Sequence, residues 1–144
     1  MQRQFPTRPI LCVGGAVIQN NAVALVRRRH DPNRGEWTIP GGAVEIDERI
    51  KAAVRREVRE ETGLVAEPLQ LITVFERIIR KEGRLQYHYV VLDYACKCSG
   101  GELCPASDAL DARWVLRRDL ARYKLRSATV SVIQQAFKIL QELR

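Results

Sequence analysis

The first third of the chain contains two apolar runs separated by a polar turn. Residues 10–18 are almost continuously apolar, residues 22–26 form a second run, and Asn20 and Asn21 stand between them. Asparagine tolerates the left-handed backbone conformation of a tight hairpin turn. The pattern therefore predicts two paired strands, followed by a polar loop over residues 27–35 that contains strong structure breakers.

A helical pattern occupies the middle of the chain. The sequence predicts a helix over residues 47–63, because Asp47 is a good N-cap type and Gly63 is a residue that commonly ends helices. An apolar stripe along this helix should face the core, and its members are Ile50, Val54 and Val58.

The second half of the chain alternates between strand-like and helical patterns. Expected strands cover residues 69–79, 85–95 and 112–116, with turns over 81–84 and at 100–101; a brief helix covers 119–123, and an amphipathic helix starts near Ser127. Strands followed by one central and one terminal helix predict an α+β fold with a mixed sheet between helices. Without repeats or linker-like tracts, residues 1–144 are expected to form one domain.

Composition narrows the class of protein. A chain of 144 residues can bury a core without disulfides, and its hydrophobic content of 46% is too high for disorder. No apolar run approaches the ~20 residues of a membrane span. The start of the chain lacks a secretory apolar segment, so the four cysteines are expected to be reduced thiols and the protein to be cytoplasmic.

The charge balance is basic, with 24 Lys and Arg against 17 Asp and Glu. Such a balance fits a nucleic-acid partner, a small polyphosphate substrate, or a solvated surface. Charge alone favours the solvated surface.

Acidic side chains interrupt the apolar stripe of the predicted central helix. At about 100° per residue, Glu57 and Glu61 fall inside the stripe and Glu60 beside it. Buried carboxylates need cations. Arg56 can reach Glu60 one helical turn on, which is the ordinary ion-pair explanation, but Glu57 and Glu61 are left without a helical partner. A hard divalent cation, Mg²⁺ above all, is the alternative.

The same segment carries a spaced motif. Gly42 is followed after five residues by Glu48, and after seven more by the run Arg56-Glu57-Val58-Arg59-Glu60-Glu61-Thr62-Gly63-Leu64. Over residues 42–64 this resembles the signature of the Nudix hydrolases at all nine specified positions, and the approach over residues 37–42 is also typical of that family. The resemblance implies an α/β/α sandwich over nearly the whole chain.

The resemblance also implies site residues. Glu57, Glu60 and Glu61 correspond to the metal-binding carboxylates, and the carbonyl of Gly42 to a further ligand. The implied metal is Mg²⁺, for which Mn²⁺ can substitute. Glu48 and Arg56 are similar to the ion pair that supports the metal-binding residues of the family.

The implied reaction is hydrolysis of a pyrophosphate bond by water, which needs a base to accept a proton. In the family that base lies either in the signature helix or on a later loop. Asp108 is a late catalytic candidate and Asp111 a substrate-binding candidate. The alternative is that both belong to a capped turn before the strand at residues 112–116.

Some further residues have two interpretations. One arginine of the run at residues 27–29 could bind phosphate; because strand side chains alternate, not all three can face one site, and Arg28 is the choice. The alternative is a solvated loop edge. Trp37, Tyr87 and Tyr89 either stack on a base or pack in the core, and core packing is favoured for each. The sequence Cys96-x-Cys98 lacks the spacing of a zinc site, so buried thiols are favoured.

Three functions remain open from the sequence. The favoured one is Mg²⁺-dependent cleavage of nucleoside diphosphates linked to another group, with ADP-ribose-like conjugates preferred. The second is a MutT-type nucleoside triphosphate pyrophosphohydrolase that releases a monophosphate and pyrophosphate. The third is a non-catalytic module that binds nucleotides or RNA. The expected partner is a small nucleotide; a membrane is excluded, nucleic acid is disfavoured, and a homodimer is allowed.

Overall fold

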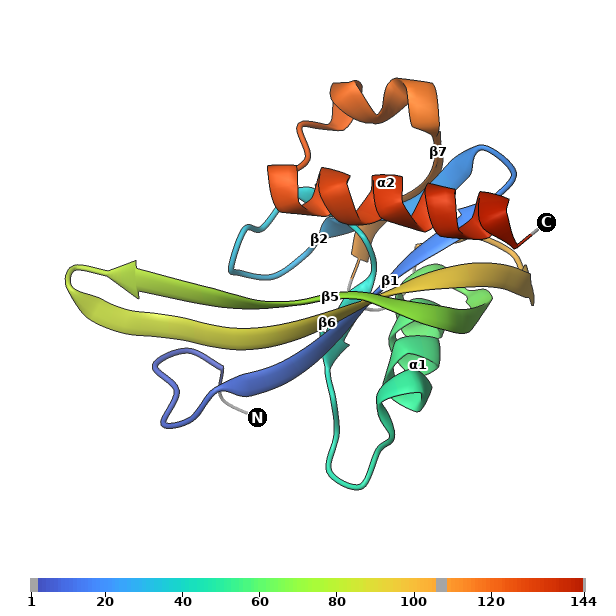
Figure 1. The fold of residues 1–144 in the computed structure, drawn as a ribbon. Helices are drawn as coiled ribbons and strands as arrows, with labels where there is room; N and C mark the ends of the chain where they lie inside the picture. Colours follow the sequence, from blue (N-terminus) through green and yellow to red (C-terminus); the bar gives the residue numbers. More distant parts are fainter. Residues whose placement is uncertain (1–2, 106–108, 144) are drawn as a thin grey trace.

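Ten elements of secondary structure follow one another in the described part of the chain (Figure 1). The computed structural model describes residues 3–105 and 109–143. The elements are β1 (Ile10–Gln19), β2 (Ala22–Arg28), β3 (Trp37–Thr38), β4 (Gly41–Ala43), α1 (Ile50–Thr62), β5 (Leu64–Lys81), β6 (Arg84–Gly101), β7 (Ala109–Leu116), the 3-10 helix η1 (Arg117–Tyr123) and α2 (Ser127–Glu142).

The strands form one mixed sheet. Its order is β3-β2-β1-β6-β5, with β4 paired to β1 and β7 paired to β2. The central pair, β1 and β6, is parallel, and the other pairs are antiparallel. The predicted α+β class with a mixed sheet is confirmed.

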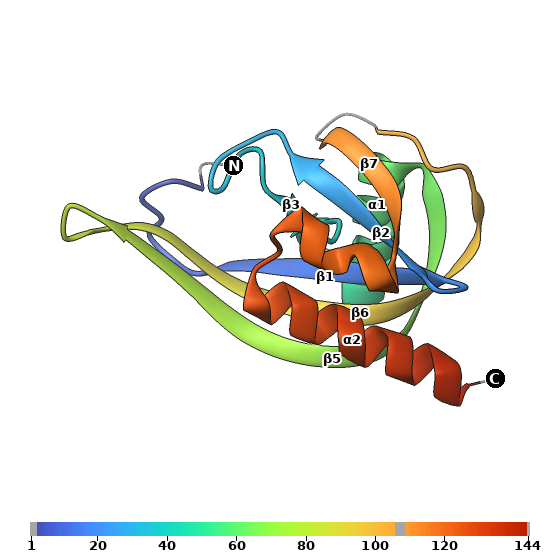
Figure 2. The same ribbon diagram turned by 90° about the horizontal axis from the view of Figure 1, so that it is seen from above.

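The two long helices cover opposite faces of the sheet (Figures 1 and 2). On one face Val54 and Val58 of α1 pack with Val13 and Val17 of β1. On the other face α2 packs against the sheet through a cluster that includes Ile133. Burial of these apolar side chains on both faces accounts for the nearly continuous apolar run predicted for β1.

The strands of the second half are longer than expected. The sequence predicts strands at residues 69–79 and 85–95, whereas β5 and β6 each run for 18 residues and pair along their whole length. Pro68 discourages a strand, yet β5 contains it because β5 is an edge strand and the pairing shifts register between Pro68 and Gln70. The far end of this hairpin projects beyond the body of the molecule (Figure 1).

The start of the central helix was predicted wrongly. The helix begins at Ile50 and not at Asp47, and Asp47 has a φ of 66°, in the left-handed region. A residue in that conformation is not an N-cap, which is extended. Instead Arg49 is extended at this end without a capping side chain. The predicted end is confirmed, because Gly63 has a φ of 77° and its N–H donates to the Arg59 carbonyl.

The structure confirms some of the remaining expectations from the sequence and adds two short strands. The turn at Asn20, the turn at residues 81–84 and the start of α2 at Ser127 are confirmed. The short strands β3 and β4 were not predicted, since two or three residues carry no periodicity.

All four cysteines are free thiols. Among the helices in the described part of the chain, none has the length and apolar character needed to span a bilayer.

Candidate active site

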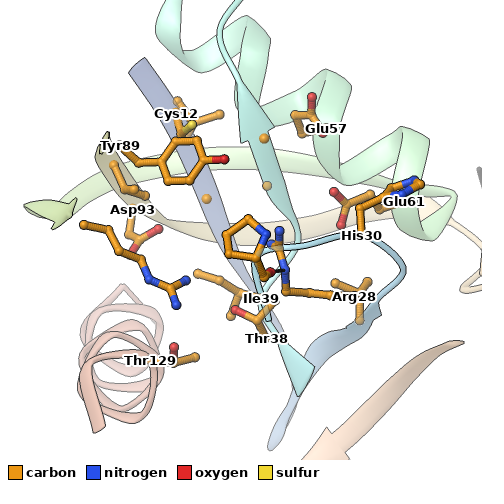
Figure 3. Close-up of a pocket in the computed structure, with 18 of the residues that line it drawn as sticks. Cys12, Arg28, His30, Thr38, Ile39, Glu57, Glu61, Tyr89, Asp93 and Thr129 are labelled. Atoms are coloured by element: carbon orange, nitrogen blue, oxygen red, sulfur yellow. Dashed lines mark hydrogen bonds between the residues drawn. The ribbon is translucent and has the colours of Figure 1, made fainter. Parts of the chain in front are cut away.

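A cavity of about 210 Å³ lies between β4, α1 and the start of α2 (Figure 3). Strand β1 pairs with β4 from Cys12 to Gly14, and with β2 only near its other end, at Ile18 and Gln19. The cavity lies between these neighbours, and residues of β1, β2, β4, β5, β6, α1 and α2 line it. It therefore collects side chains that lie far apart in the sequence.

Two carboxylates of α1 lie on one side of the cavity. Glu57 is 8% exposed and Glu61 is 9% exposed, and both line the cavity wall (Figure 3). Burial raises the pKa of Glu57, while a hydrogen bond from Arg56 opposes that effect. The prediction that these two carboxylates fall on the buried side of the helix is confirmed.

Arg56 is the centre of an ionic network behind these carboxylates. Its Nε and Nη2 donate to the two carboxylate oxygens of Glu48 at 2.7 and 2.9 Å. Its Nη1 donates to Glu57 at 2.8 Å and to Glu60 at 3.2 Å. The hydrogen bond with Arg56 lowers the pKa of Glu48, and the bond with Glu48 raises the pKa of Arg56. The network fixes the helix relative to the preceding loop, since Nη2 also donates to the Ala43 carbonyl at 2.9 Å.

This network corrects the helical-wheel argument. Glu57 was expected to lack a partner within the helix, but the neighbouring residue Arg56 supplies one. The wheel separates adjacent residues by about 100°, whereas the long arginine side chain spans that angle. The reach of Arg56 to Glu60 is confirmed.

The three glutamates do not converge in the structure. Glu60 does not line the cavity, and its carboxylate is about half exposed beside Arg56. Within residues 3–105 and 109–143, no group of three or more His, Cys, Asp or Glu lies close enough together to hold a metal ion. Arg56 instead holds Glu57 and Glu60 through hydrogen bonds from its Nη1.

Gly42 lies directly against Glu57. A Cβ atom at position 42 would be 2.6 Å from both carboxylate oxygens of Glu57, so any side chain there would force the carboxylate to move. Glycine therefore allows the backbone of β4 to approach the carboxylate. Carboxylate and backbone oxygens are the donors that hard divalent cations prefer, so a cavity lined by Glu57, Glu61 and Gly42 fits such an ion.

Cations line the same cavity. Arg28 does so at the end of β2, where its Nε donates to the Pro32 carbonyl at 2.7 Å. Arg29 also lines the cavity although it follows Arg28 directly, because β2 has ended and strand alternation no longer applies. Arg77 of β5 lines it as well, and burial, followed by the nearby charges of Arg126 and Arg28, lowers its pKa. Anionic ligands would relieve this concentration of positive charge.

Of the two late acidic candidates, the structure describes only Asp111. Asp108 lies outside the described residues. Asp111 is part of β7, where its carboxylate accepts from the Ala112 N–H at 2.8 Å and from Arg113 Nε at 3.1 Å. Asp111 is not among the cavity residues, and the structure does not bring it together with Glu57 and Glu61.

The sequence analysis missed several cavity residues. Three polar ones among them are Arg77, Asp93 and Thr129. For Asp93 a signal was available, because it is a single acidic residue within the apolar run Val90-Val91-Leu92-Asp93-Tyr94-Ala95. For Arg77 and Thr129 the sequence offers no comparable signal, since each stands in an ordinary amphipathic element.

The comparisons with known proteins agree on one family. The model of the NUDIX domain family matches residues 9–136. An ADP-ribose pyrophosphatase from Methanocaldococcus jannaschii is 32% identical over 106 residues, which are 74% of this chain and 61% of that protein. This chain thus spans about three fifths of the length of that relative.

Two further similarities cover more of the compared proteins. The nucleoside triphosphatase NudI from Salmonella schwarzengrund is 36% identical over 132 residues, covering 85% of this chain and 91% of that protein. The crystal structure of a MutT NUDIX hydrolase from Burkholderia pseudomallei superposes with a TM-score of 0.74 at 28% identity, covering 89% of this chain and 98% of that one.

Proposed function

Because this chain belongs to the NUDIX domain family, we propose that it is a Mg²⁺-dependent hydrolase that cleaves the pyrophosphate bond of nucleoside diphosphates linked to another group. ADP-ribose-like conjugates are the preferred class in this proposal. The observation that carries it is a single cavity with two buried carboxylates and several arginines in its wall. Such a wall suits a ligand that consists of a cation and a pyrophosphate.

The proposal assigns roles to the residues of α1 and β4. Glu57, Glu61 and the Gly42 carbonyl would hold Mg²⁺, and Glu60 would join them if its carboxylate left Arg56. Bound Mg²⁺ supplies neutralisation of charge on the phosphate oxygens. Arg56 and Glu48 orient Glu57 through the network of hydrogen bonds described above.

Other residues would bind and orient the substrate. Arg28 lines the cavity, and in this proposal its guanidinium donates to phosphate oxygens. Asp111 as a substrate-binding residue and Asp108 as a catalytic residue stay predictions from the sequence. A carboxylate near the attacked phosphorus would accept the proton of the water, and Glu61 and Glu57 are the described candidates.

The support for the substrate class is the name of one relative and the length of the cavity. The Methanocaldococcus jannaschii relative is called an ADP-ribose pyrophosphatase. The cavity continues from Glu57 and Glu61 past Ile39 to Asp93 and Thr129 (Figure 3). A substrate with a second group beyond the pyrophosphate would use that additional length.

A triphosphate substrate is the second candidate, because the Salmonella schwarzengrund relative that aligns over nearly its full length is called a nucleoside triphosphatase.

We expect kcat/KM for ADP-ribose to exceed that for canonical and oxidised nucleoside triphosphates when all are assayed at equal Mg²⁺, with products identified by chromatography. ADP-ribose should yield AMP and ribose 5-phosphate. If kcat/KM for any triphosphate is about tenfold higher than for ADP-ribose, the second candidate replaces the first. A tenfold difference corresponds to ~1.4 kcal/mol in transition-state stabilisation.

The non-catalytic alternative makes a different prediction in the same assay. A module that only binds RNA or nucleotides would show no Mg²⁺-dependent turnover of any substrate, together with RNA affinity that falls steeply with salt.

The free cysteines support the cytoplasm as the compartment of the proposed enzyme.

Replacement of Gly42 by Ala tests the close contact between β4 and α1. We expect Gly42→Ala to reduce kcat/KM by about 100-fold, because the new Cβ forces the Glu57 carboxylate out of place. Gly100→Ala is the matched control, since a Cβ there meets its nearest atom only at 3.9 Å. Equal activity of the two variants would show that Glu57 does not need its present position.

A further inference from the structure

Asp93 is a buried carboxyl group at the wall of the cavity. It lies on β6 opposite Gly14 of β1 in the parallel pair, and it is 5% exposed. A Cβ at Gly14 would collide with Asp93 Oδ1 and would be 3.3 Å from Ile39 Cδ1. The carboxyl group therefore lies over the β1 backbone beside Ile39.

No side chain satisfies this carboxyl group. The backbone of Asp93 is paired with β1 and β5, but within residues 3–105 and 109–143 its carboxyl group makes no hydrogen bond and no ion pair. Burial raises its pKa to about 7. A buried polar group without a partner is costly, and Asp93 lines the cavity, so a ligand that donates hydrogen bonds would compensate for the cost.

The surroundings of Asp93 are apolar and aromatic. Tyr89 and Val91 precede it at alternate positions of β6, and Phe75 of β5 is paired with Val91; all three line the cavity. Apolar and aromatic walls with a small number of polar groups, here Asp93 and Thr129, are typical of sites that bind a heterocyclic ring by stacking and by hydrogen bonds to its edge. An anionic phosphate would be repelled by the carboxyl group.

Asp93 is also separated from the carboxylates of α1. Figure 3 shows Asp93 and Thr129 on one side of the pocket and Glu57 and Glu61 on the other. A group held at Asp93 is thus distinct from the pyrophosphate that reacts near α1.

We propose that Asp93 positions the nucleobase of the substrate by accepting hydrogen bonds from its exocyclic amino group, and thereby favours amino-bearing bases over uracil. This inference rests on the proposed function. Adenine, guanine and cytosine each present an amino donor on one edge. Uracil presents carbonyl acceptors on either side of its single N–H, and these repel the oxygen atoms of the carboxyl group.

The first test uses two substrates that differ only in the base, ADP-glucose and UDP-glucose. We expect the wild-type protein to prefer ADP-glucose by at least tenfold in kcat/KM, mainly through a lower KM. Asp93→Asn should remove most of that preference, because the amide N–H of asparagine can donate a hydrogen bond to a uracil carbonyl. Asp119→Asn, a carboxyl change in η1 outside the cavity, should leave the preference unchanged. An equal loss for both substrates, or no loss, would overturn the proposal.

The second test needs neither a variant nor turnover. Calorimetric binding of AMP and IMP to the wild-type protein in EDTA compares an amino group with a carbonyl at the same ring position. We expect AMP to bind about tenfold more tightly, and equal affinities would overturn the role of Asp93. If this discrimination is found while no nucleotide is hydrolysed, the proposed function fails and the base-binding role stands. If nucleotides are hydrolysed but AMP and IMP bind equally well, the base-binding role of Asp93 fails and the proposed function stands.

Discussion

Replacing Glu61 by Gln is expected to reduce kcat by about a thousandfold in a protein that still folds. The side chain lies buried at the cavity wall, and the amide has nearly the same shape but no charge. A lost metal-ligand charge acts mainly on the transition state, where the phosphate needs the most neutralisation, and a thousandfold is ~4 kcal/mol. Steady-state kinetics at saturating Mg²⁺ measures the effect, and circular dichroism checks the fold.

The same reasoning applies to Glu60→Gln, although Glu60 faces Arg56 in the structure and must turn toward the cavity to act. Glu67→Gln is the control for both variants, because Glu67 is an exposed glutamate of β5 outside the cavity. Near-normal turnover of Glu61→Gln would reject its assignment to the metal site. Near-normal turnover of Glu60→Gln alone would leave a site built on Glu57 and Glu61.

Arg56→Gln is expected to lower the free energy of unfolding by about 3 kcal/mol and to reduce activity as well. Arg56 donates to Glu48, Glu57 and Glu60 and to the Ala43 carbonyl, and its side chain is only 22% exposed. Removing one partner of a buried ion pair costs ~3–5 kcal/mol, and the partial exposure of this network places the cost at the lower end. Urea unfolding of the metal-free protein measures the stability.

Arg59→Gln is the matched control, because it removes an exposed arginine from the same helix. Its effect on stability should stay within about 0.5 kcal/mol. If Arg56→Gln were equally mild, Glu57 would not depend on Arg56 as its partner. Added Mg²⁺ should restore part of the stability lost in Arg56→Gln, since the cation replaces the positive charge beside Glu57.

The central helix shows how far the sequence alone is sufficient. Periodicity placed Glu57 and Glu61 on the buried side, because every residue of a helix turns by about 100° whatever surrounds it. The end at Gly63 followed in the same way from local conformational preference. The start of the helix could not be predicted in this way. Asp47 has a left-handed backbone conformation in a loop that the pairing of Glu48 with Arg56 ties to the helix. That tertiary contact overrode the N-cap preference.

The part of the cavity around Asp93 could not be predicted without the tertiary structure. The pairing of β1 with β6 places Asp93 against Gly14, and the antiparallel pairing of β5 with β6 brings Phe75 beside Val91. Strand register is chosen by packing on both faces of the sheet, and a shift by one residue would turn every one of these side chains to the other face.

The sequence by itself determined the family signature over residues 42–64 and the buried carboxylates of α1, since both follow from spacing within one continuous segment. Only the tertiary structure decided that Arg77, Asp93 and Thr129 share a cavity with Glu57 and Glu61. These residues come from separate strands and helices, and their convergence depends on long-range pairing that no local pattern of side chains encodes.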